Sequence, residues 1–272
     1  MDKKMYKLIA VDMDGTLLNE NKEISNRCKK AVGELKNRGK KLVLATGRPI
    51  NGVMRYLEKL NLFDDNDYVI TYNGALVQST KTKHIIFDKP LSLNAYQELY
   101  ILSKELKVNI HALTDQCVLT PKNNPYTELE SNINQIPILV GAVEDIDAST
   151  IIVKVMFVDD PDKLDAALAQ LPNWVKEKYT ILRSAPHFLE FLDKSVNKGV
   201  GVSAVAKQLG LKREEVICVG DAGNDLDMIR YAGLGVAMGN AFDEIKSEAD
   251  YITHSNEEDG VAHVIEEFML KK

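Results

Sequence analysis

Two aspartates separated by one residue directly follow a short apolar run, Leu8 to Val11, at the start of the sequence. Such a run predicts a buried strand, and ligands of open parallel sheets bind beyond the carboxyl ends of the strands. Charged carboxylates as close as those of Asp12 and Asp14 repel each other unless a cation resolves the repulsion. Magnesium, a hard cation that prefers oxygen ligands, would do so. Because Asp and Gly15 also favour turns, this segment alone leaves a magnesium site and a surface turn as alternatives.

Two further segments carry groups that suit a phosphate. Thr46 and Gly47 follow the apolar run from Lys41 to Ala45, and a hydroxyl beside a bare glycine amide can bind phosphate oxygens at close range. Lys198 opens a segment with helical periodicity. A lysine at a helix N-terminus faces the positive end of the helix dipole, which is unfavourable unless an anion such as phosphate lies between them. An ordinary turn and a solvated lysine remain the alternatives.

The last chemical segment runs from Gly220 to Asp225 and follows another apolar run, Val216 to Val219. Asp221, Asn224 and Asp225 provide a second source of oxygen ligands at a strand end. Alone, the segment could also be a calcium-loop fragment or a turn, but it is not an EF-hand, because neither the ligand spacing nor the terminal glutamate of that motif is present.

These segments occur in the order Asp-x-Asp, Thr-Gly-Arg, Asn-Lys-Gly and Gly-Asp-x-x-Asn-Asp, and Tyr72-Asn-Gly-Ala and Phe188-Leu-Glu accompany them. The combination resembles the haloacid-dehalogenase-like superfamily, and within it the Cof-type, YidA-like sugar phosphatases. The resemblance extends over essentially the whole chain. It implies a Rossmann-like α/β core with an inserted α+β cap of the C2 type. It also implies a Mg²⁺-dependent phosphatase that hydrolyses small phosphorylated metabolites, with sugar phosphates expected, through an aspartyl-phosphate intermediate.

The resemblance also implies a role for each matching residue. Asp12 would be the nucleophile, and Asp14 would be the acid and base. The metal ligands would be Asp12, Asp14 (through its backbone carbonyl) and Asp221, while Asp225 would orient Lys198 or a metal-bound water. Phosphate contacts would come from Met13, Thr46, Gly47, Lys198 and Asn224, and the candidates for contact with substrate or cap are Asn73, His187 and Glu190. The chain departs from the usual pattern at Ala222 and Gly223, which affects what is expected of the loop but not of the metal and phosphate positions.

Apolar runs that alternate with amphipathic segments at both ends of the chain predict the elements that position these residues in a parallel α/β sheet. The predicted strands are 8–11, 41–45, 68–72, 216–219 and 234–237, with a hairpin of 75–78 and 84–87. The predicted helices begin at Ser25 and after Pro49 and then cover 200–209, 224–231 and 257–270. The intervening region shows helices at about 92–107 and 161–170 and strands at 153–158 and 188–192. We therefore predict a core domain of residues 1–84 and 191–272 and a cap of residues 85–190.

Composition limits the class of partner and the compartment. The 272 residues carry a net charge of −6, and their Lys and Arg are spread along the chain, which argues against nucleic acid as a partner. The three cysteines show no metal or redox spacing. No apolar run approaches the ~18 residues of a membrane span. We expect a cytoplasmic monomer or homodimer that does not bind a membrane.

Three other functions fit part of the pattern. A phosphotransferase or phosphomutase of the same fold would pass the phosphoryl group to a hydroxyl instead of water. A receiver-like phospho-signalling module also uses an acidic magnesium site with Thr and Lys, but it is about half this length and its phosphorylated Asp lies on a later strand. A non-catalytic phosphometabolite-binding protein would not need both acids of Asp-x-Asp.

Overall fold

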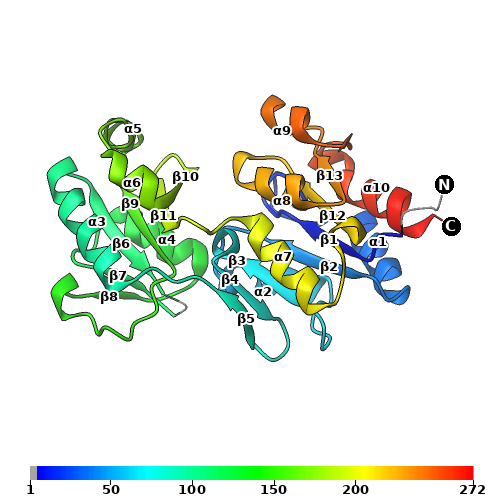
Figure 1. Ribbon diagram of the computed structural model, residues 1–272, viewed down its shortest axis with the longest axis horizontal. Helices are drawn as coiled ribbons and strands as arrows, with labels where there is room; N and C mark the ends of the chain where they lie inside the picture. The colour runs from blue at the N-terminus through cyan, green and yellow to red at the C-terminus, as the bar shows by residue number, and fades with distance from the viewer. Residues whose placement is uncertain (1–4, 115, 272) are drawn as a thin grey trace. The chain divides into compact units, whose positions relative to one another are not determined.

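A computed structural model describes residues 5–114 and 116–271 of the chain (Figure 1). These residues form two compact units. The first unit contains the described chain up to Thr46, Val53–Asp88 and the described chain from Asn197 onward. The second contains Gly47–Gly52 and Lys89–Val196. Two segments of the second unit are therefore inserted into the sequence of the first, and the longer of them contains a second sheet.

The first unit is built on an eight-stranded sheet with the order β14-β13-β12-β1-β2-β3-β4-β5. Strands β14 to β3 of this order run parallel, and β4 and β5 are antiparallel to their neighbours. Ile9 lies opposite both Ile217 and Leu42, so β1 is central although β12 comes from the far end of the chain. The strands are β1 (Leu8–Val11), β2 (Lys41–Ala45), β3 (Tyr68–Thr71), β4 (Leu76–Ser79), β5 (Ile85–Asp88), β12 (Val216–Gly220), β13 (Leu234–Ala237) and β14 (Tyr251–Ile252).

Helices cover both faces of this sheet. Leu8 and Ala10 of β1 pack in one cluster with Val202 and Val205, while Ile9 and Val11, which are equally buried, alternate with them and face the other way. A strand that is apolar on both sides is typical of a parallel sheet with helices on each face. The helices of the first unit are α1 (Asn26–Asn37), α2 (Met54–Lys59), α7 (Lys198–Gln208), α8 (Leu226–Tyr231), α9 (Asp243–Glu248) and α10 (Gly260–Val264).

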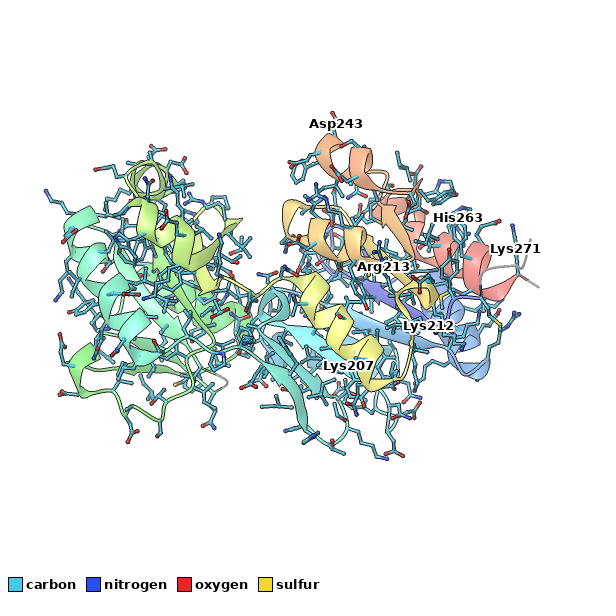
Figure 2. All side chains as sticks on the ribbon, viewed as in Figure 1. Lys207, Lys212, Arg213, Asp243, His263 and Lys271 are labelled. Carbon is cyan, nitrogen blue, oxygen red and sulfur yellow. The ribbon has the colours of Figure 1, made fainter. Side chains whose placement is uncertain are left out.

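Side-chain caps set where the longer helices start. Ser25 accepts a hydrogen bond from the Cys28 amide (3.0 Å) at the start of α1, and Asn197 accepts one from the Val200 amide (2.8 Å) at the start of α7. Figure 2 shows Lys207 near the end of α7 and Arg213 beyond it. Arg213 donates a hydrogen bond to the carbonyl of Arg230 (3.0 Å), which satisfies one of the terminal carbonyls of α8.

The second unit has a six-stranded sheet of order β10-β11-β9-β6-β7-β8, in which β7 and β8 are the parallel pair. Phe157 and Phe191 meet edge to face with ring centroids 4.6 Å apart, in a core that also contains Tyr96 and Leu99 of α3. The strands are β6 (Asn109–Leu113), β7 (Val118–Thr120), β8 (Ile138–Val140), β9 (Lys154–Val158), β10 (Tyr179–Ala185) and β11 (Phe188–Asp193). The helices are α3 (Leu93–Leu106), α4 (Pro125–Asn134), α5 (Pro161–Ala169) and α6 (Asn173–Lys178).

This architecture confirms the predicted fold class, a parallel α/β core with an inserted α+β unit. Two predicted helices are interrupted. The helix expected after Pro49 consists of the short turn η1 (Ile50–Gly52) followed by α2, and the helix expected at 257–270 is broken by Asp259, which has a left-handed φ of 61°. The prediction contained none of α4, α6, α9, β6, β7, β8, β10 and β14. Within the described residues, no helix combines the length and apolar character needed to cross a bilayer.

Candidate active site

Asp12 follows the last residue of the central strand β1. Its amide donates a hydrogen bond to the Val219 carbonyl of the adjacent β12 (3.0 Å), which extends the pairing of the two strands to this residue. The chain then turns sharply, and the amides of Leu17 and Leu18 donate to the carbonyls of Asp12 (3.2 Å) and Met13 (2.9 Å). Among residues 5–114 and 116–271, none accepts a hydrogen bond from the Met13 amide. The turn therefore holds a buried carboxylate beside a backbone donor that an anion can use.

Three carboxylates converge at the ends of β1 and β12. One oxygen from each of Asp12, Asp221 and Asp225 lies within 4.8 Å of the others. Burial raises the pKa of Asp12 well above its ordinary range; Lys198 opposes this shift, and the other two aspartates add to it. Burial also raises the pKa of Asp221, to about 6. The negative charge of the three carboxylates is thus only partly offset by Lys198.

Lys198, the first residue of α7, is fully buried and lies between two of these acids. Its Nζ atom is 2.5 Å from Oδ1 of Asp12 and 2.6 Å from Oδ1 of Asp225. Burial alone would lower the pKa of Lys198, but the two neighbouring carboxylates raise it above its ordinary value. The ammonium group is therefore charged, and it fixes one oxygen of Asp12 in place.

Asp225 also shapes the loop that carries Asp221. Its Oδ2 atom accepts hydrogen bonds from the amides of Asp221 (3.0 Å) and Ala222 (3.1 Å). A side chain at Gly220 would overlap Cβ of Asp225, so the residue before this loop must be glycine. The fully buried Asp225 is thus bonded both to Lys198 and to the loop backbone.

Thr16 orients the third carboxylate. Its hydroxyl donates a hydrogen bond of 2.6 Å to Oδ1 of Asp221, and the side chain is almost fully buried. Gly15 has a φ of 88°, and a Cβ there would overlap the carboxylate of Asp221. Sequence reasoning gave Thr16 no role, although its place directly after Asp-x-Asp-Gly was an available signal.

The donor set of the carboxylate cluster fits magnesium. In the part of the chain that the structure describes, Lys198 is the one cation that forms ion pairs within the cluster, with Asp12 and Asp225, so three carboxylates share a single positive charge. All of the converging donors are oxygens, which a hard divalent cation prefers. Burial is the largest cause of the raised pKa values of Asp12 and Asp221, and the neighbouring carboxylates raise them further.

The side chain of Asp14 lies outside this cluster. Its Oδ1 atom is 2.9 Å from Nζ of Lys22, and 40% of the side chain is exposed. The two acids of Asp-x-Asp therefore differ in environment: Asp12 is buried among charges, whereas Asp14 is half-exposed and pairs with Lys22. The close repulsion that we expected between these two side chains is replaced by repulsion of Asp12 with Asp221 and Asp225, because the turn after β1 directs the Asp14 side chain elsewhere.

Asn73 connects the remaining candidates of the first unit. It follows β3, and its amide donates to the carbonyl of Thr46 (2.9 Å), while its Oδ1 accepts a hydrogen bond from Nδ2 of Asn224 (3.0 Å). Tyr72 and Asn73 both have left-handed φ values, of 50° and 56°. Such a conformation costs most L-residues, tyrosine included, roughly 1–2 kcal/mol, whereas asparagine adopts it more readily. A strained turn thus lies between the segments that carry Thr46 and Asn224.

The other candidates belong to the second unit. His187 stacks on Tyr126 with ring centroids 5.0 Å apart, and its Nδ1 lies 3.2 Å from the carbonyl of Asp159. Glu190 is buried and accepts hydrogen bonds from Lys154 (2.9 Å) and Ser184 (2.6 Å). Gly47 is part of the same unit through the segment Gly47–Gly52.

Two asparagines form hydrogen bonds with the backbone of the loop after β1, and the sequence alone did not indicate either of them. Nδ2 of Asn240 donates to the Gly15 carbonyl (2.8 Å), and Nδ2 of Asn256 donates to the Leu18 carbonyl (2.9 Å). The Asn256 amide in turn donates to Oδ1 of Asn240 (3.0 Å). Nothing in the spacing of these residues indicated the contacts, since they depend on how the last strands pack.

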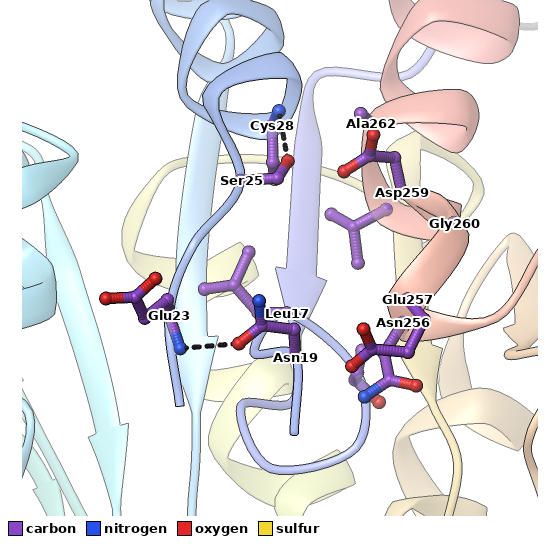
Figure 3. Close-up of a pocket in the computed structure, with 12 residues that line it drawn as sticks. Leu17, Asn19, Glu23, Ser25, Cys28, Asn256, Glu257, Asp259, Gly260 and Ala262 are labelled. Atoms are coloured by element: carbon purple, nitrogen blue, oxygen red, sulfur yellow. Dashed lines mark hydrogen bonds between the residues drawn. The ribbon is translucent and has the colours of Figure 1, made fainter. Parts of the chain in front are cut away.

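A small cavity lies behind this loop (Figure 3). Its lining includes Asn19, Glu23 and Cys28 on one side and Asn256 and Asp259 on the other. Its volume is about 50 Å³, whereas sites for small organic ligands usually measure about 300–1,000 Å³. We therefore do not assign it a substrate.

A family model described as haloacid dehalogenase-like hydrolase matches residues 9–265. The Bacillus subtilis protein YxeH is 46% identical over 270 residues, 98% of this chain and 100% of YxeH. The B. subtilis 5-amino-6-(5-phospho-D-ribitylamino)uracil phosphatase YcsE is 33% identical over 97% of this chain and 96% of its own. The solved structure of the subclass IIB sugar phosphatase BT4131 superposes with a TM-score of 0.77 at 26% identity, over 96% of this chain and 98% of that chain.

Proposed function

The chain belongs to the haloacid dehalogenase-like hydrolase family and is a phosphatase, and from this premise we propose a Mg²⁺-dependent monoesterase that acts on phosphorylated sugars through an aspartyl phosphate. The observation that carries the proposal is the buried carboxylate of Asp12. Lys198 holds one of its oxygens, and two further carboxylates lie beside it. A dianionic ester can approach such a carboxylate only where positive charge offsets the repulsion.

We assign the cation to Asp12 and Asp221, with the backbone carbonyl of Asp14 as a further ligand. Bound magnesium would supply positive charge that reduces repulsion between the ester and the carboxylates. Asp225 stays bonded to Lys198 and to the loop backbone in this assignment, so it acts by positioning the lysine.

In the proposed first step, Asp12 attacks phosphorus, a bond forms between its carboxylate oxygen and phosphorus, and the bond from phosphorus to the leaving oxygen breaks. Asp14 gives its proton to the leaving oxygen, which departs as an alcohol. In the second step, Asp14 takes a proton from water, the water oxygen attacks phosphorus, and the bond to Asp12 breaks. The products are orthophosphate and the restored carboxylate. The half-exposed position of Asp14 supports this role, because an acid that exchanges protons with solvent can serve both steps.

Contacts to the transferring phosphoryl group are proposed for the amides of Met13 and Gly47, the hydroxyl of Thr46, and the side chains of Lys198 and Asn224. The free amide of Met13 and the buried ammonium of Lys198 support this assignment most directly. Such preorganised donors stabilise charge as it redistributes over the phosphoryl oxygens.

We propose that the longer segment of the second unit, Lys89–Val196, is the cap expected at residues 85–190 and that it selects the substrate. His187 and Glu190 remain candidates there, although both already have protein partners in that unit. The names of YcsE and BT4131 refer to a phosphorylated ribityl compound and to sugar phosphates, which supports a phosphorylated polyhydroxy carbon chain as the substrate class. The free, buried cysteines at 28, 117 and 218 support the cytoplasm as the compartment.

The experiment that tests this function is a phosphatase screen over sugar phosphates, nucleotides and vitamin phosphates, with Mg²⁺ and with a chelator. We expect sugar phosphates to release free orthophosphate when Mg²⁺ is present and to release none when the chelator removes it. Reaction in ¹⁸O-labelled water separates hydrolysis from transfer to another hydroxyl, because only hydrolysis incorporates the label into orthophosphate. Activity that does not depend on Mg²⁺, or a phosphoenzyme that persists, would contradict the proposal.

A further inference from the structure

Asn73 lies where three segments of the proposed phosphate site meet. Its amide is bonded to Thr46, its side chain is bonded to Asn224, and the next residue, Gly74, packs against the residue that caps α7. Gly74 has a φ of 100°, and a Cβ there would overlap the carbonyl oxygen of Asn197. The turn after β3 is therefore in close contact with the segment that places Lys198.

We propose that Asn73 is a positioning residue that orients the amide of Asn224 toward the phosphoryl group, an inference that rests on the proposed phosphatase function. Asn73 is almost fully buried, whereas Asn224 is only partly buried. The bond of 3.0 Å from Nδ2 of Asn224 to Oδ1 of Asn73 fixes the plane of the Asn224 amide. A side-chain amide has two N–H groups, so the second remains to donate to a phosphate oxygen.

The left-handed conformation of Asn73 explains why an asparagine suits this position. Most L-residues avoid such a backbone, but asparagine tolerates it and also carries a side-chain acceptor. The conformation lets the Asn73 amide reach the Thr46 carbonyl while the side chain reaches Asn224. The residue thus links the end of β2 to the loop after β12.

Substitution by glycine separates the two roles of this residue. Asn73→Gly keeps the amide and adopts the left-handed φ without strain, so the bond to Thr46 and the turn are retained. It removes the acceptor of Asn224. The matched control is Asn61→Gly, since Asn61 also has a left-handed φ, of 51°, but is exposed at the end of α2.

The experiment measures binding of inorganic phosphate by calorimetry with saturating Mg²⁺, steady-state kinetics and thermal unfolding. We expect Asn73→Gly to weaken phosphate binding and lower kcat/KM by about tenfold each, which corresponds to the loss of one oriented hydrogen bond. The unfolding temperature and the Mg²⁺ concentration for half-maximal activity should stay unchanged. Asn61→Gly should match the wild type in every measurement.

A double variant tests whether Asn73 acts through Asn224. We expect Asn73→Gly combined with Asn224→Ala to differ less than twofold from Asn224→Ala alone, because the positioned group is already absent. Multiplicative losses, or full phosphate affinity in Asn73→Gly, would overturn the inference while leaving the phosphatase assignment in place. A wild-type protein that neither binds phosphate nor hydrolyses esters would instead refute the proposed function, and this inference with it.

Discussion

Lys198 and Asp12 are 186 residues apart in the sequence, yet the lysine Nζ lies 2.5 Å from Oδ1 of the aspartate, and both groups are buried. The contact exists because β1 and β12 are neighbours and α7 leads into β12. It joins the proposed nucleophile to the cation that controls its charge, and several measurable consequences follow from it.

Replacement of Asp12 by Asn should abolish turnover of a generic phosphate ester without unfolding the protein. The amide cannot act as the nucleophile, while its size is unchanged, and loss of one carboxylate relieves repulsion within the cluster. We expect activity below a thousandth of the wild type, in line with single losses of catalytic nucleophiles, and an unchanged or higher unfolding temperature without Mg²⁺. Appreciable hydrolysis by the variant would exclude Asp12 as the nucleophile.

Replacement of Lys198 by Met should destabilise the protein strongly. It leaves the buried carboxylates of Asp12 and Asp225 without their cation, and breaking a buried ion pair costs about 3–5 kcal/mol. Urea denaturation without Mg²⁺ measures the change in the free energy of unfolding. The matched control is Lys22→Met, because Lys22 pairs with Asp14 at 2.9 Å but both side chains are at least 40% exposed. That variant should lose less than about 1 kcal/mol, and equal losses in the two variants would contradict the argument.

The stabilisation that Mg²⁺ provides should grow between about pH 4 and pH 6. Burial raises the pKa of Asp221 to about 6, above the value near 4 of an unfolded chain, so the folded protein binds this proton more tightly. In the metal-free protein this group therefore stabilises the fold below about pH 4, and the contribution is lost as the pH rises through 6.

Magnesium competes with that proton and should restore the lost stability. Thermal unfolding with and without Mg²⁺ at about pH 5 and pH 7.5 measures the effect, and the Mg²⁺-induced shift should be larger at the higher pH. Asp221→Asn is the control, since it should remove most of the shift at both values. A shift of equal size at both values in the wild type would contradict the involvement of Asp221.

Replacement of Thr16 by Val should weaken Mg²⁺ binding with little effect on the maximal rate. The substitution removes the hydroxyl that donates to Asp221 at 2.6 Å and changes the shape of the side chain very little. A hydrogen bond to a charged group contributes about 1.5–3 kcal/mol, so the Mg²⁺ concentration for half-maximal activity should rise by about tenfold or more. The control Thr253→Val removes an equally buried hydroxyl that donates to the Gly260 carbonyl (2.9 Å), and it should alter stability alone. A normal Mg²⁺ requirement in Thr16→Val would rule out this role.

Replacement of Gly74 by Ala should prevent normal folding, because both the φ of 100° and the contact with the Asn197 carbonyl exclude a side chain. Circular dichroism and soluble yield measure the outcome. Gly33→Ala, in the interior of α1 where no atom lies within 4 Å of an added Cβ, should instead stabilise the protein by about 0.5–1 kcal/mol. A well-folded Gly74→Ala protein would show that the turn after β3 is more adaptable than its geometry indicates.

The sequence alone predicted the parts of the fold that depend on local patterns. The strands that end at Val11 and Ala45 are continuous apolar runs, and the start of α1 is marked by the capping Ser25. In the second unit, β7 and β8 have three residues each, too few to show the alternation of apolar and polar residues that marks a strand. In β6, the polar His111 interrupts the apolar run. Those strands form because of their neighbours rather than because of their own sequence.

The same distinction applies to the site. The convergence of Asp12 and Asp221 was predictable, because parallel strands end at the same edge of a sheet. The pairing of Asp14 with Lys22 and the contacts of Asn240 and Asn256 were not, since they depend on the turn at Gly15 and on packing across the loop. The identities of the chemical groups are thus readable from the sequence, whereas their orientations are a property of the folded chain.

The adjacency of β1 and β12 has a consequence for biosynthesis. Leu8 is synthesised before the second unit, but its partner Val216 emerges only after the whole of that unit has been synthesised. At about 5–20 residues per second, the ribosome needs roughly 10–40 s to bridge that interval. Throughout it, one edge of the nascent sheet has no partner strand, and unpaired edges promote aggregation. We therefore expect chaperone demand to peak before β12 leaves the exit tunnel.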